Sequence, residues 1–450
     1  MPRATAYRAE WVVPVVGAPI RGGEVVVEAG RIAEVRKASG LHGADVRDLG
    51  DAILLPGLVN AHTHLDWTLQ RGLVEDLPFF AWVQALTSRA KRMGEEDWLT
   101  SATVGAAEAI SAGVTTVADC SFSGAALTAA QSVGLRGIVY QELFGVEAVQ
   151  PVDEAIDYVR WKIGRLREIA SGSRLRVGIS PHSLYTVRPE LWKAAAAFAA
   201  SEGIAICSHA AESQAESDLI RTGTGPIAEA LRARAVRWRL PGVTPVAYLE
   251  TLGALSPTTL LAHGVQVSTS DVAVVRRTGA AWVHCPKSNA KLGNGVAPLD
   301  LLWSMYSDGE SRVGLGSDSV ASNNGIDLFE EMRFAILVQR AHRRRADTPT
   351  AERLLKMATI DGARALGLEA ETGSLEPGKQ ADLCAVRLDR PAMTPTHDPV
   401  AALVYSASAR DVLLTVVGGD ETYCDGRVAG MDWRSLRVRA KELAGRLREP

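Results

Sequence analysis

The feature that most constrains the fold is an alternation of apolar runs with alanine-rich stretches through the middle of the chain. The stretches at 100–112 and 191–202 have helical composition, and each leads into an apolar run typical of a buried strand. Strands that alternate with helices predict a parallel sheet with crossover helices. The predicted strands are residues 53–59, 114–119, 135–142, 175–180, 204–208, 259–263, 280–284 and 312–316. Eight such units predict a closed barrel.

The two chain ends have a different sequence pattern. Short β-rich pieces at 24–28 and 31–35 resemble those at 381–386 and 412–417, and turns containing glycine separate them. We therefore predict an α/β fold, a distorted (β/α)8 TIM barrel with a small β-sandwich domain built from both chain ends. The expected divisions are 1–55 plus 370–430 for the sandwich, 56–369 for the catalytic barrel and 431–450 for a C-terminal helix.

Charge and cysteine content exclude several function classes. The 450 residues carry 49 basic and 52 acidic side chains, a net charge of -3, which argues against a nucleic-acid or membrane-surface partner. The five cysteines show no C-x-x-C spacing, which favours a reducing cytoplasm over a disulfide framework. No targeting signal or spanning segment stands out. We expect a cytoplasmic protein with a small-molecule partner.

A pair of histidines indicates a metal site. His62 and His64 lie two residues apart at the end of the first apolar run, so their side chains point to the same side of a strand and reach one cation. Further metal- or proton-competent residues each follow a later predicted strand. They are His182, His209, His263, His284 and Asp318. Because a barrel of this kind carries its chemistry at the carboxyl ends of its strands, we expect all of them at one mouth.

Four motifs resemble the amidohydrolase superfamily, in its cytosine/adenosine-type deaminase branch. They are residues 56–64, 208–212, 262–264 and 316–318, in the order and spacing of that family. The resemblance covers nearly the whole chain. It implies that His62, His64, His209 and Asp318 hold one divalent metal ion, Zn²⁺ or Fe²⁺, with a water completing the site.

The resemblance also implies a mononuclear site and a set of catalytic roles. Relatives with two metal ions bridge them with a lysine at the end of the fourth strand, and residues 177–182 contain none. In the resembling deaminases the glutamate at Glu212 moves a proton from the attacking water to a ring nitrogen, which requires a pKa near neutrality. His263 and Asp318 would orient and deprotonate the water. A helix-capping role is the alternative for Glu212.

Substrate contacts are expected from residues near the predicted mouth. These are His182, Glu212, His284, Trp67, Trp82, Ser319 and Asn289. The two tryptophans are equally compatible with packing at the rim, since aromatic side chains are large apolar fillers first. His284 is equally compatible with a hydrogen bond to a loop carbonyl.

Other stretches narrow the substrate. Residues 286–295 and 321–333 resemble the subgroup that deaminates the 6-amino group of adenine nucleosides with 5′ substituents. Residues 78–83, 141–145 and 223–249 resemble aminodeoxyfutalosine deaminases. We therefore expect 6-amino-6-deoxyfutalosine, an intermediate of menaquinone biosynthesis, as the substrate.

Several alternatives stay open. The first is an S-adenosylhomocysteine, methylthioadenosine or adenosine deaminase, although Lys91 stands where the adenosylhomocysteine enzymes carry a ribose-binding glutamate. A triazine-type hydrolase and a non-catalytic binding protein on the same fold are more distant. The resemblance also suggests a homodimer, because relatives often pair across the barrel.

Overall fold

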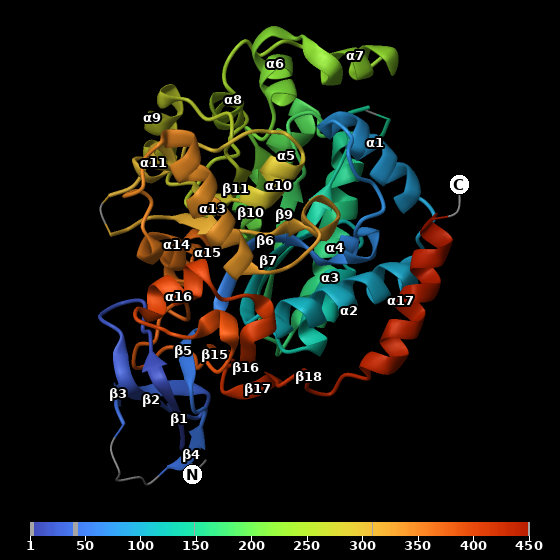
Figure 1. Cartoon of the computed structure of the whole chain (residues 1–450). Helices are drawn as coiled ribbons and strands as arrows, with labels where there is room; N and C mark the ends of the chain where they lie inside the picture. Colours follow the sequence, from blue (N-terminus) through green and yellow to red (C-terminus); the bar gives the residue numbers. More distant parts are fainter. Residues whose placement is uncertain (1–3, 39–43, 148, 308, 449–450) are drawn as a thin grey trace.

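Two sheets organise the molecule (Figure 1). The computed structural model describes residues 4–38, 44–147, 149–307 and 309–448. Within these residues, the middle of the chain forms one nine-stranded sheet and the two chain ends form a second. The predicted fold class is confirmed. The predicted ranges also included residues 1–3, 39–43, 148, 308, 449 and 450, which lie outside the described residues.

The first sheet is a parallel barrel whose strands follow chain order. Its strands are β6 (Leu58–His64), β7 (Val114–Ser121), β8 (Arg136–Leu143), β9 (Leu175–Pro181), β10 (Ile206–Ala210), β11 (Thr259–His263), β12 (Ala281–His284), β13 (Val313–Leu315) and β14 (Asp318–Ser319). The eighth strand is broken, because β13 pairs with β12 whereas β14 pairs with β6. These two ladders close the barrel. At the break, a Cβ on Gly316 would lie 2.9 Å from His62 Cβ, so glycine permits the close approach.

The predicted first strand at 53–59 is wrong as a single element. The chain leaves the small sheet at the end of β5 (Ala52–Pro56) and enters the barrel with β6. Gly57 separates them, and a Cβ there would lie 2.1 Å from the Thr115 side chain. Both strands are buried, so an unbroken apolar run does not reveal where the chain changes sheets.

Helices surround the barrel and follow its strands (Figure 1). The sequence explains their ends locally. In α5 (Pro189–Glu202), a proline opens the first turn and Gly203 closes the helix at φ 61°, while Leu191, Trp192 and other apolar residues face the core. The remaining barrel helices include α2 (Glu95–Ser111), α3 (Ala125–Ser132), α4 (Val152–Ala170), α9 (Thr269–Thr278), α13 (Leu328–Arg343), α14 (Ala351–Met357) and α15 (Ile360–Leu366).

Shorter helices lie in the loops at the carboxyl ends of the strands. They are the 3-10 helix η1 (Leu65–Gln70), α1 (Phe79–Ala90), α6 (Gln214–Thr222), α7 (Gly225–Ala233), α8 (Pro245–Thr251), α10 (Pro286–Lys291), α11 (Leu299–Trp303) and α12 (Val320–Asn323). The segment predicted as an insertion at 223–249 contains α7 and most of α8. In Figure 1, α6 and α7 lie at the end of the barrel away from the small sheet.

The second sheet joins the two chain ends directly. Its strands are β1 (Thr5–Val12), β2 (Ile20–Glu28), β3 (Arg31–Lys37), β4 (Asp45–Asp48), β5, β15 (Leu383–Arg387), β16 (Val412–Val417), β17 (Asp420–Cys424) and β18 (Arg427–Val428). The antiparallel ladder between β5 and β15 runs from Pro56 opposite Leu383 to Ala52 opposite Arg387. Val25 and Leu414, from opposite chain ends, belong to one buried core.

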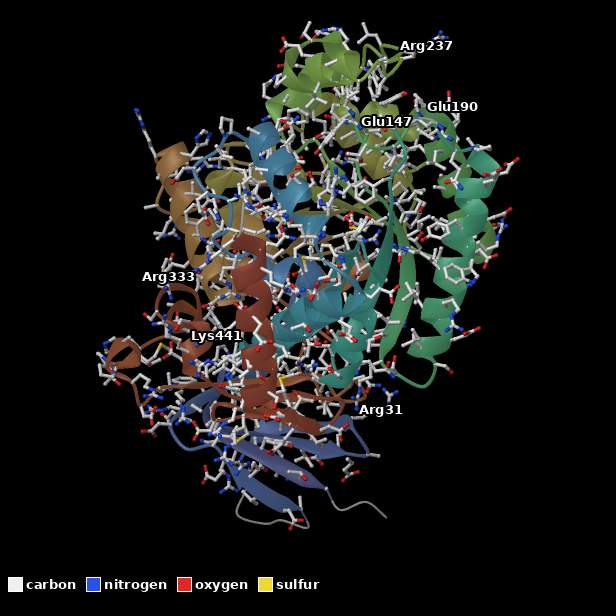
Figure 2. All side chains as sticks on the ribbon, turned by 90° about the vertical axis from the view of Figure 1, so that its right-hand side faces the viewer. Arg31, Glu147, Glu190, Arg237, Arg333 and Lys441 are labelled. Carbon is white, nitrogen blue, oxygen red and sulfur yellow. The ribbon has the colours of Figure 1, made fainter. Side chains whose placement is uncertain are left out.

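Two helices from the C-terminal part pack on the barrel. After β15 the chain forms η2 (Pro391–Met393), α16 (Pro399–Tyr405) and η3 (Ala409–Asp411), and α16 lies against α13 and α14. The last helix, α17 (Trp433–Arg448), packs Leu443 and Leu447 against Met93 and Trp98 beside α2. Figure 2 shows α17, marked by Lys441, along the outside of the molecule. Among the described residues, no helix combines the length and the apolar character needed to cross a membrane.

A buried ion pair ties the barrel to the small sheet. Arg136, at the first residue of β8, donates from Nε to Asp382 Oδ2 over 2.7 Å, and the two side chains are 6% and 0% exposed. Asp382 Oδ1 also accepts the backbone N–H of Gly418 at 2.7 Å. Arg136 Nη1 also donates to Glu371 Oε2 at 3.4 Å, so removal of Asp382 leaves the buried guanidinium with only this longer ion pair. The pair lies at the amino ends of the strands, away from the catalytic end of such barrels.

We expect Asp382→Ala to lower the free energy of unfolding by about 3 kcal/mol, because it leaves the buried Arg136 guanidinium with only its 3.4 Å ion pair to Glu371. Urea unfolding followed by circular dichroism measures the change. The control is Asp157→Ala, which removes an exposed ion pair with Arg160 and should change stability little. Equal effects of the two substitutions would show that the buried pair does not support the fold.

Candidate metal centre and active site

The carboxyl ends of the barrel strands bring metal-competent side chains into one buried cluster. His62, His209, His263 and Asp318 each contribute one donor atom, and these atoms all lie within 4.8 Å of one another. His64 adjoins them, with its Nε2 at 3.2 Å from His209 Nε2 and 3.5 Å from Asp318 Oδ1. Imidazole nitrogens and a carboxylate suit Zn²⁺ and related divalent ions. We call these five residues the His/Asp cluster.

The hydrogen bonds around the cluster leave nitrogen lone pairs free for a cation. His209 Nδ1 lies 2.9 Å from the carbonyl oxygen of His182, and His263 Nδ1 lies 2.9 Å from Asn289 Oδ1. Each Nδ1–H therefore donates outward, as in most metal-binding histidines. The Nε2 atoms of His62 and His263 are buried and have no hydrogen-bond partner among the described residues. The donor set thus fits a divalent cation.

The electrostatics of the cluster favour neutral imidazoles. Burial lowers the pKa of His64 to about 3 and of His263 to about 4, and burial with the neighbouring histidines lowers the pKa of His209 well below its usual range. Burial also opposes a charge on His62, but the nearby Asp318 carboxylate and Cys120 side chain outweigh it and raise the pKa of His62 to about 10. A cation would compete with that His62 proton, because a metal ligand must be deprotonated.

Asp318 is held with one oxygen turned toward the histidines. Its Oδ2 accepts hydrogen bonds from Ser288 Oγ at 2.5 Å and Ser322 Oγ at 3.0 Å, and its Oδ1 lies 3.5 Å from His62 Nε2. Burial would raise the pKa of Asp318, but the hydrogen bond to His62 and the nearby histidine charges hold it well below its usual range. The carboxylate therefore stays ionised beside the donors.

Glu212 lies beside the cluster with the properties of a proton carrier. Its Oε1 is 3.9 Å from His263 Nε2 and accepts a hydrogen bond from Asn294 Nδ2 at 3.1 Å. Burial and the charge of Asp318 raise the pKa of Glu212 to about 8. The Glu216 carboxylate fixes this loop, because it accepts the backbone N–H groups of Ala211 and Glu212 at 3.1 and 2.8 Å. A carboxyl group that titrates near neutrality can both take and give a proton.

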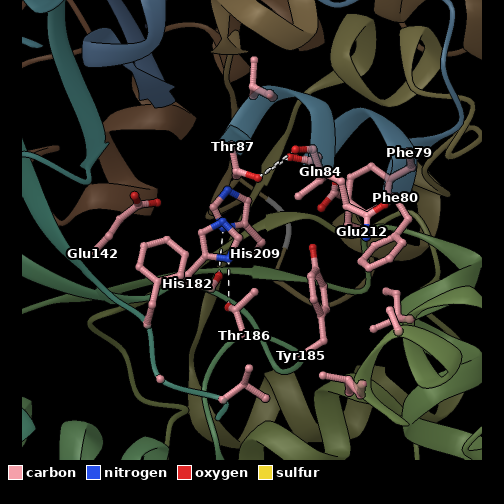
Figure 3. A pocket seen from close by; sticks show the side chains of 18 of the residues that line it. Phe79, Phe80, Gln84, Thr87, Glu142, His182, Tyr185, Thr186, His209 and Glu212 are labelled. Atoms are coloured by element: carbon pink, nitrogen blue, oxygen red, sulfur yellow. Dashed lines mark hydrogen bonds between the residues drawn. The ribbon is translucent and has the colours of Figure 1, made fainter. Parts of the chain in front are cut away.

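A cavity of about 620 Å³ opens onto the cluster (Figure 3). Its inner end is polar, and in Figure 3 Glu142 and Glu212 lie on either side of His209. Its outer walls come largely from α1 and α7 and from the segment after β8. Lining residues from these walls are Phe79, Phe80, Val83, Leu86, Phe144, Val146, Ile227 and Leu231. The cavity suits a ligand with a polar reacting end and a largely apolar remainder.

The predicted substrate contacts divide into two groups. Those that line the cavity are Trp67, Trp82, His182, Glu212 and Ser319. The cavity is also lined by His64, His209, His263 and Asp318, which belong to the His/Asp cluster. His284 and Asn289 are not among the described lining residues. Asn289 instead fixes the ring of His263. His284 is buried, and its burial, with the charge of His263, lowers its pKa to about 3.

Sequence reasoning missed residues that act on the site through shape or support. Glu142 ends the third barrel strand, lines the cavity and has one buried oxygen without a hydrogen-bond partner among the described residues. The strand-end position that selected the histidines would also have found it. Ser288 and Asn294 lie within a stretch used only for the family resemblance. Glu216 carries no sequence signal, since its role depends on how the loop after β10 folds.

Comparison with known proteins agrees with this architecture. Residues 53–422 match the model of the amidohydrolase family. The chain is 36% identical to a 5-methylthioadenosine/S-adenosylhomocysteine deaminase of Symbiobacterium thermophilum, over 97% of each chain. It is 34% identical to a 5′-deoxyadenosine deaminase of Methanothermobacter thermautotrophicus, over 91% of this chain and 89% of that one. An adenosine deaminase from Xanthomonas campestris, solved with bound zinc, superposes with a TM-score of 0.87 at 27% identity, over 99% and 98% of the two chains.

The fold and the site thus define a barrel hydrolase with a candidate metal site, and the chain belongs to the amidohydrolase family. Within that family it is a hydrolytic deaminase. The predicted family and the predicted enzyme class are both confirmed. Four residues of the His/Asp cluster, His62, His209, His263 and Asp318, form a group among the described residues that could hold a metal ion.

The raised pKa of Glu212 has a measurable effect on stability. In chelator-treated protein, the pKa of Glu212 is about 8 in the folded state, against 4.5 for an unperturbed glutamate side chain. Its contribution to stability is therefore present below about pH 4.5 and is lost as the pH rises through about 8. We expect the unfolding free energy of the wild type to fall more steeply across this window than that of Glu212→Gln, by up to about 1.4 kcal/mol per pH unit.

Urea unfolding at a series of pH values measures this difference. Glu190→Gln, which changes an exposed carboxyl group after β9, is the control and should follow the wild type. Parallel curves for the wild type and Glu212→Gln would contradict the raised pKa.

Proposed function

We propose that the enzyme releases ammonia from the 6-amino group of an adenine nucleoside with a modified 5′ position, with methylthioadenosine and S-adenosylhomocysteine as the leading substrates. The observation that carries this proposal is the position of Glu212, a buried proton carrier 3.9 Å from His263 and beside the His/Asp cluster. Ring-nitrogen protonation requires such a group. The relatives named as deaminases of adenosine derivatives support the substrate class.

Each residue of the site then has a role. His62, His64, His209 and Asp318 would hold one ion of Zn²⁺ or Fe²⁺. When bound, such an ion supplies a water with a pKa near neutrality. Asp318, ionised and next to the histidines, is the acceptor for a proton of the attacking water.

Glu212 and His263 act on the substrate ring. Glu212 donates its proton to N1 of the purine, which makes C6 more electrophilic. The proton that Asp318 took from the water then passes to the amino group, which leaves as ammonia, and Glu212 recovers a proton from the new C6 hydroxyl group. His263 Nε2 faces the same space, and Asn289 fixes the orientation of its ring. The water oxygen thus replaces the amino group, and the product is the corresponding hypoxanthine nucleoside.

The cavity accommodates the rest of such a nucleoside. A volume of about 620 Å³ exceeds what a purine alone requires and lies in the range of sites for drug-sized ligands. The apolar side chains of Phe79, Phe80 and Leu231 can cover a thioether or another apolar 5′ substituent. Deamination of a free base would leave these walls without a partner.

A second candidate substrate is 6-amino-6-deoxyfutalosine, whose 5′ substituent is an aromatic carboxylate. Arg188 favours it. The guanidinium lines the cavity and donates to the carbonyl oxygens of Gly145 and Gln150, but it forms no ion pair with a carboxylate of the described residues. Phe144 lies nearby on the same wall and can stack on an aromatic group. An anionic, aromatic 5′ substituent would pair with both.

Steady-state ammonia release by the metal-loaded enzyme tests the proposal. The panel contains methylthioadenosine, S-adenosylhomocysteine, adenosine, 6-amino-6-deoxyfutalosine and cytosine. We expect one of the 5′-modified adenine nucleosides to exceed adenosine and cytosine in kcat/KM by about tenfold or more. Glu212→Gln should lower kcat by about 100-fold or more while the bound metal is retained. Absence of ammonia release from every aminopurine nucleoside would refute the proposal and favour a triazine-type hydrolase or a binding protein.

Arg188→Gln separates methylthioadenosine from the two candidate substrates whose 5′ substituents carry a carboxylate, S-adenosylhomocysteine and 6-amino-6-deoxyfutalosine. It should lower kcat/KM by about 10- to 100-fold for substrates with a 5′ carboxylate, because a charge-assisted hydrogen bond is lost, and should leave methylthioadenosine nearly unaffected. Arg234→Gln is the matched control, since that arginine also lines the cavity but is already paired with Glu147. An equal loss for all substrates would show that Arg188 supports the loop rather than the ligand.

A further inference from the structure

Two thiol groups lie directly behind the His/Asp cluster. Cys120 on β7 and Cys207 on β10 each place Sγ at 3.9 Å from His62 Nδ1. The three side chains are fully buried. The two sulfur atoms and the His62 ring nitrogen all lie within 4.8 Å of one another. We call these three residues the thiol cluster.

The donor atoms of the thiol cluster differ in kind from those of the His/Asp cluster. Two thiolates and one imidazole nitrogen are ligands of soft cations such as Cu⁺, Cd²⁺ and Hg²⁺, whereas carboxylate oxygens are hard ligands. We propose that His62, Cys120 and Cys207 form a second metal site, selective for soft cations, which shares His62 with the catalytic site. The two sites lie on opposite edges of the same imidazole ring, since His62 Nε2 faces Asp318 at 3.5 Å.

Sharing His62 makes the two sites compete. A neutral imidazole has one lone pair, because its other ring nitrogen carries the proton. With the proton on Nδ1, Nε2 is free for the catalytic ion. With the proton on Nε2, Nδ1 is free for a soft cation, and the two thiols lose their protons to solvent as the sulfur–metal bonds form. Occupation of the thiol cluster therefore withdraws His62 from the catalytic site.

The other buried thiols provide a matched control. Cys384 on β15 is also 0% exposed, but it lies in the region where the small sheet meets the barrel and belongs to no group of potential metal donors among the described residues. Cys384→Ser therefore changes a buried thiol without changing the thiol cluster. A double substitution of Cys120→Ser and Cys207→Ser removes both sulfur ligands and keeps small polar side chains beside His62.

The test titrates Cd²⁺ into the full-length enzyme after chelator treatment, and follows the ultraviolet sulfur-to-cadmium charge-transfer absorption. We expect the band to reach its plateau at one equivalent in the wild type and in Cys384→Ser, and to fall at least fivefold in the double variant. Prior loading with Zn²⁺ should slow its appearance at least tenfold, because a zinc ion held at the His/Asp cluster through His62 Nε2 would leave the proton of the ring on Nδ1. Circular dichroism of each variant checks that it is folded.

A measurement on the wild type keeps the test independent of the variants. Cadmium X-ray absorption should show two sulfur neighbours and a nitrogen neighbour in the one-equivalent complex. A coordination shell of nitrogen and oxygen alone, or a charge-transfer band that persists in the double variant, would overturn the site. A band that appears at the same rate with and without zinc would overturn the sharing of His62.

Discussion

The central constraint on this structure is the burial of five metal-competent side chains in one small space at the barrel mouth. Burial makes a charge on any of these imidazoles costly, and each imidazole also disfavours a charge on its neighbours. Hydrogen bonds that point away from the centre of the cluster hold these side chains in place. The carbonyl of His182 and the amide of Asn289 each fix one ring, and two serine hydroxyls hold Asp318. Burying these groups together costs folding free energy, and a cation that binds their lone pairs would offset that cost.

The backbone at the barrel mouth is also strained where it positions these side chains. Ala211, His263 and Asp318 adopt left-handed conformations, with φ of 51°, 80° and 59°, although none of them is glycine. Such conformations persist where the surroundings determine them, and they concentrate at functional sites. Asp318 reaches its position only because the eighth strand breaks at Gly316 and resumes beside β6. The irregularity of the barrel is thus what joins its last strand to its first at the metal site.

Much of this arrangement could be predicted from the sequence because two simple rules apply. The alternation of strands and helices sets the barrel, and the position just after a strand places His182, His209 and Glu212 at one mouth. The rules fail where the tertiary structure decides. An apolar run does not show that β5 and β6 belong to different sheets. Strand-end position alone does not distinguish His263, which lines the cavity, from His284, which is buried and is not among the described lining residues.

The inner and outer parts of the cavity have different chemical roles. The inner part, with Glu212, His263 and the His/Asp cluster, can serve any reaction in which water replaces an amine on a protonated ring. The outer part is built from α1, α7 and the segment after β8, which are loop elements with no share in the strand ladders of the barrel. Loop elements can change in length and composition without disturbing the ladders that position the metal donors. Under the proposed function, these loops would determine which 5′ substituent is accepted, and a substitution such as one at Arg188 would alter substrate choice while the proposed proton transfers at Glu212 stay the same.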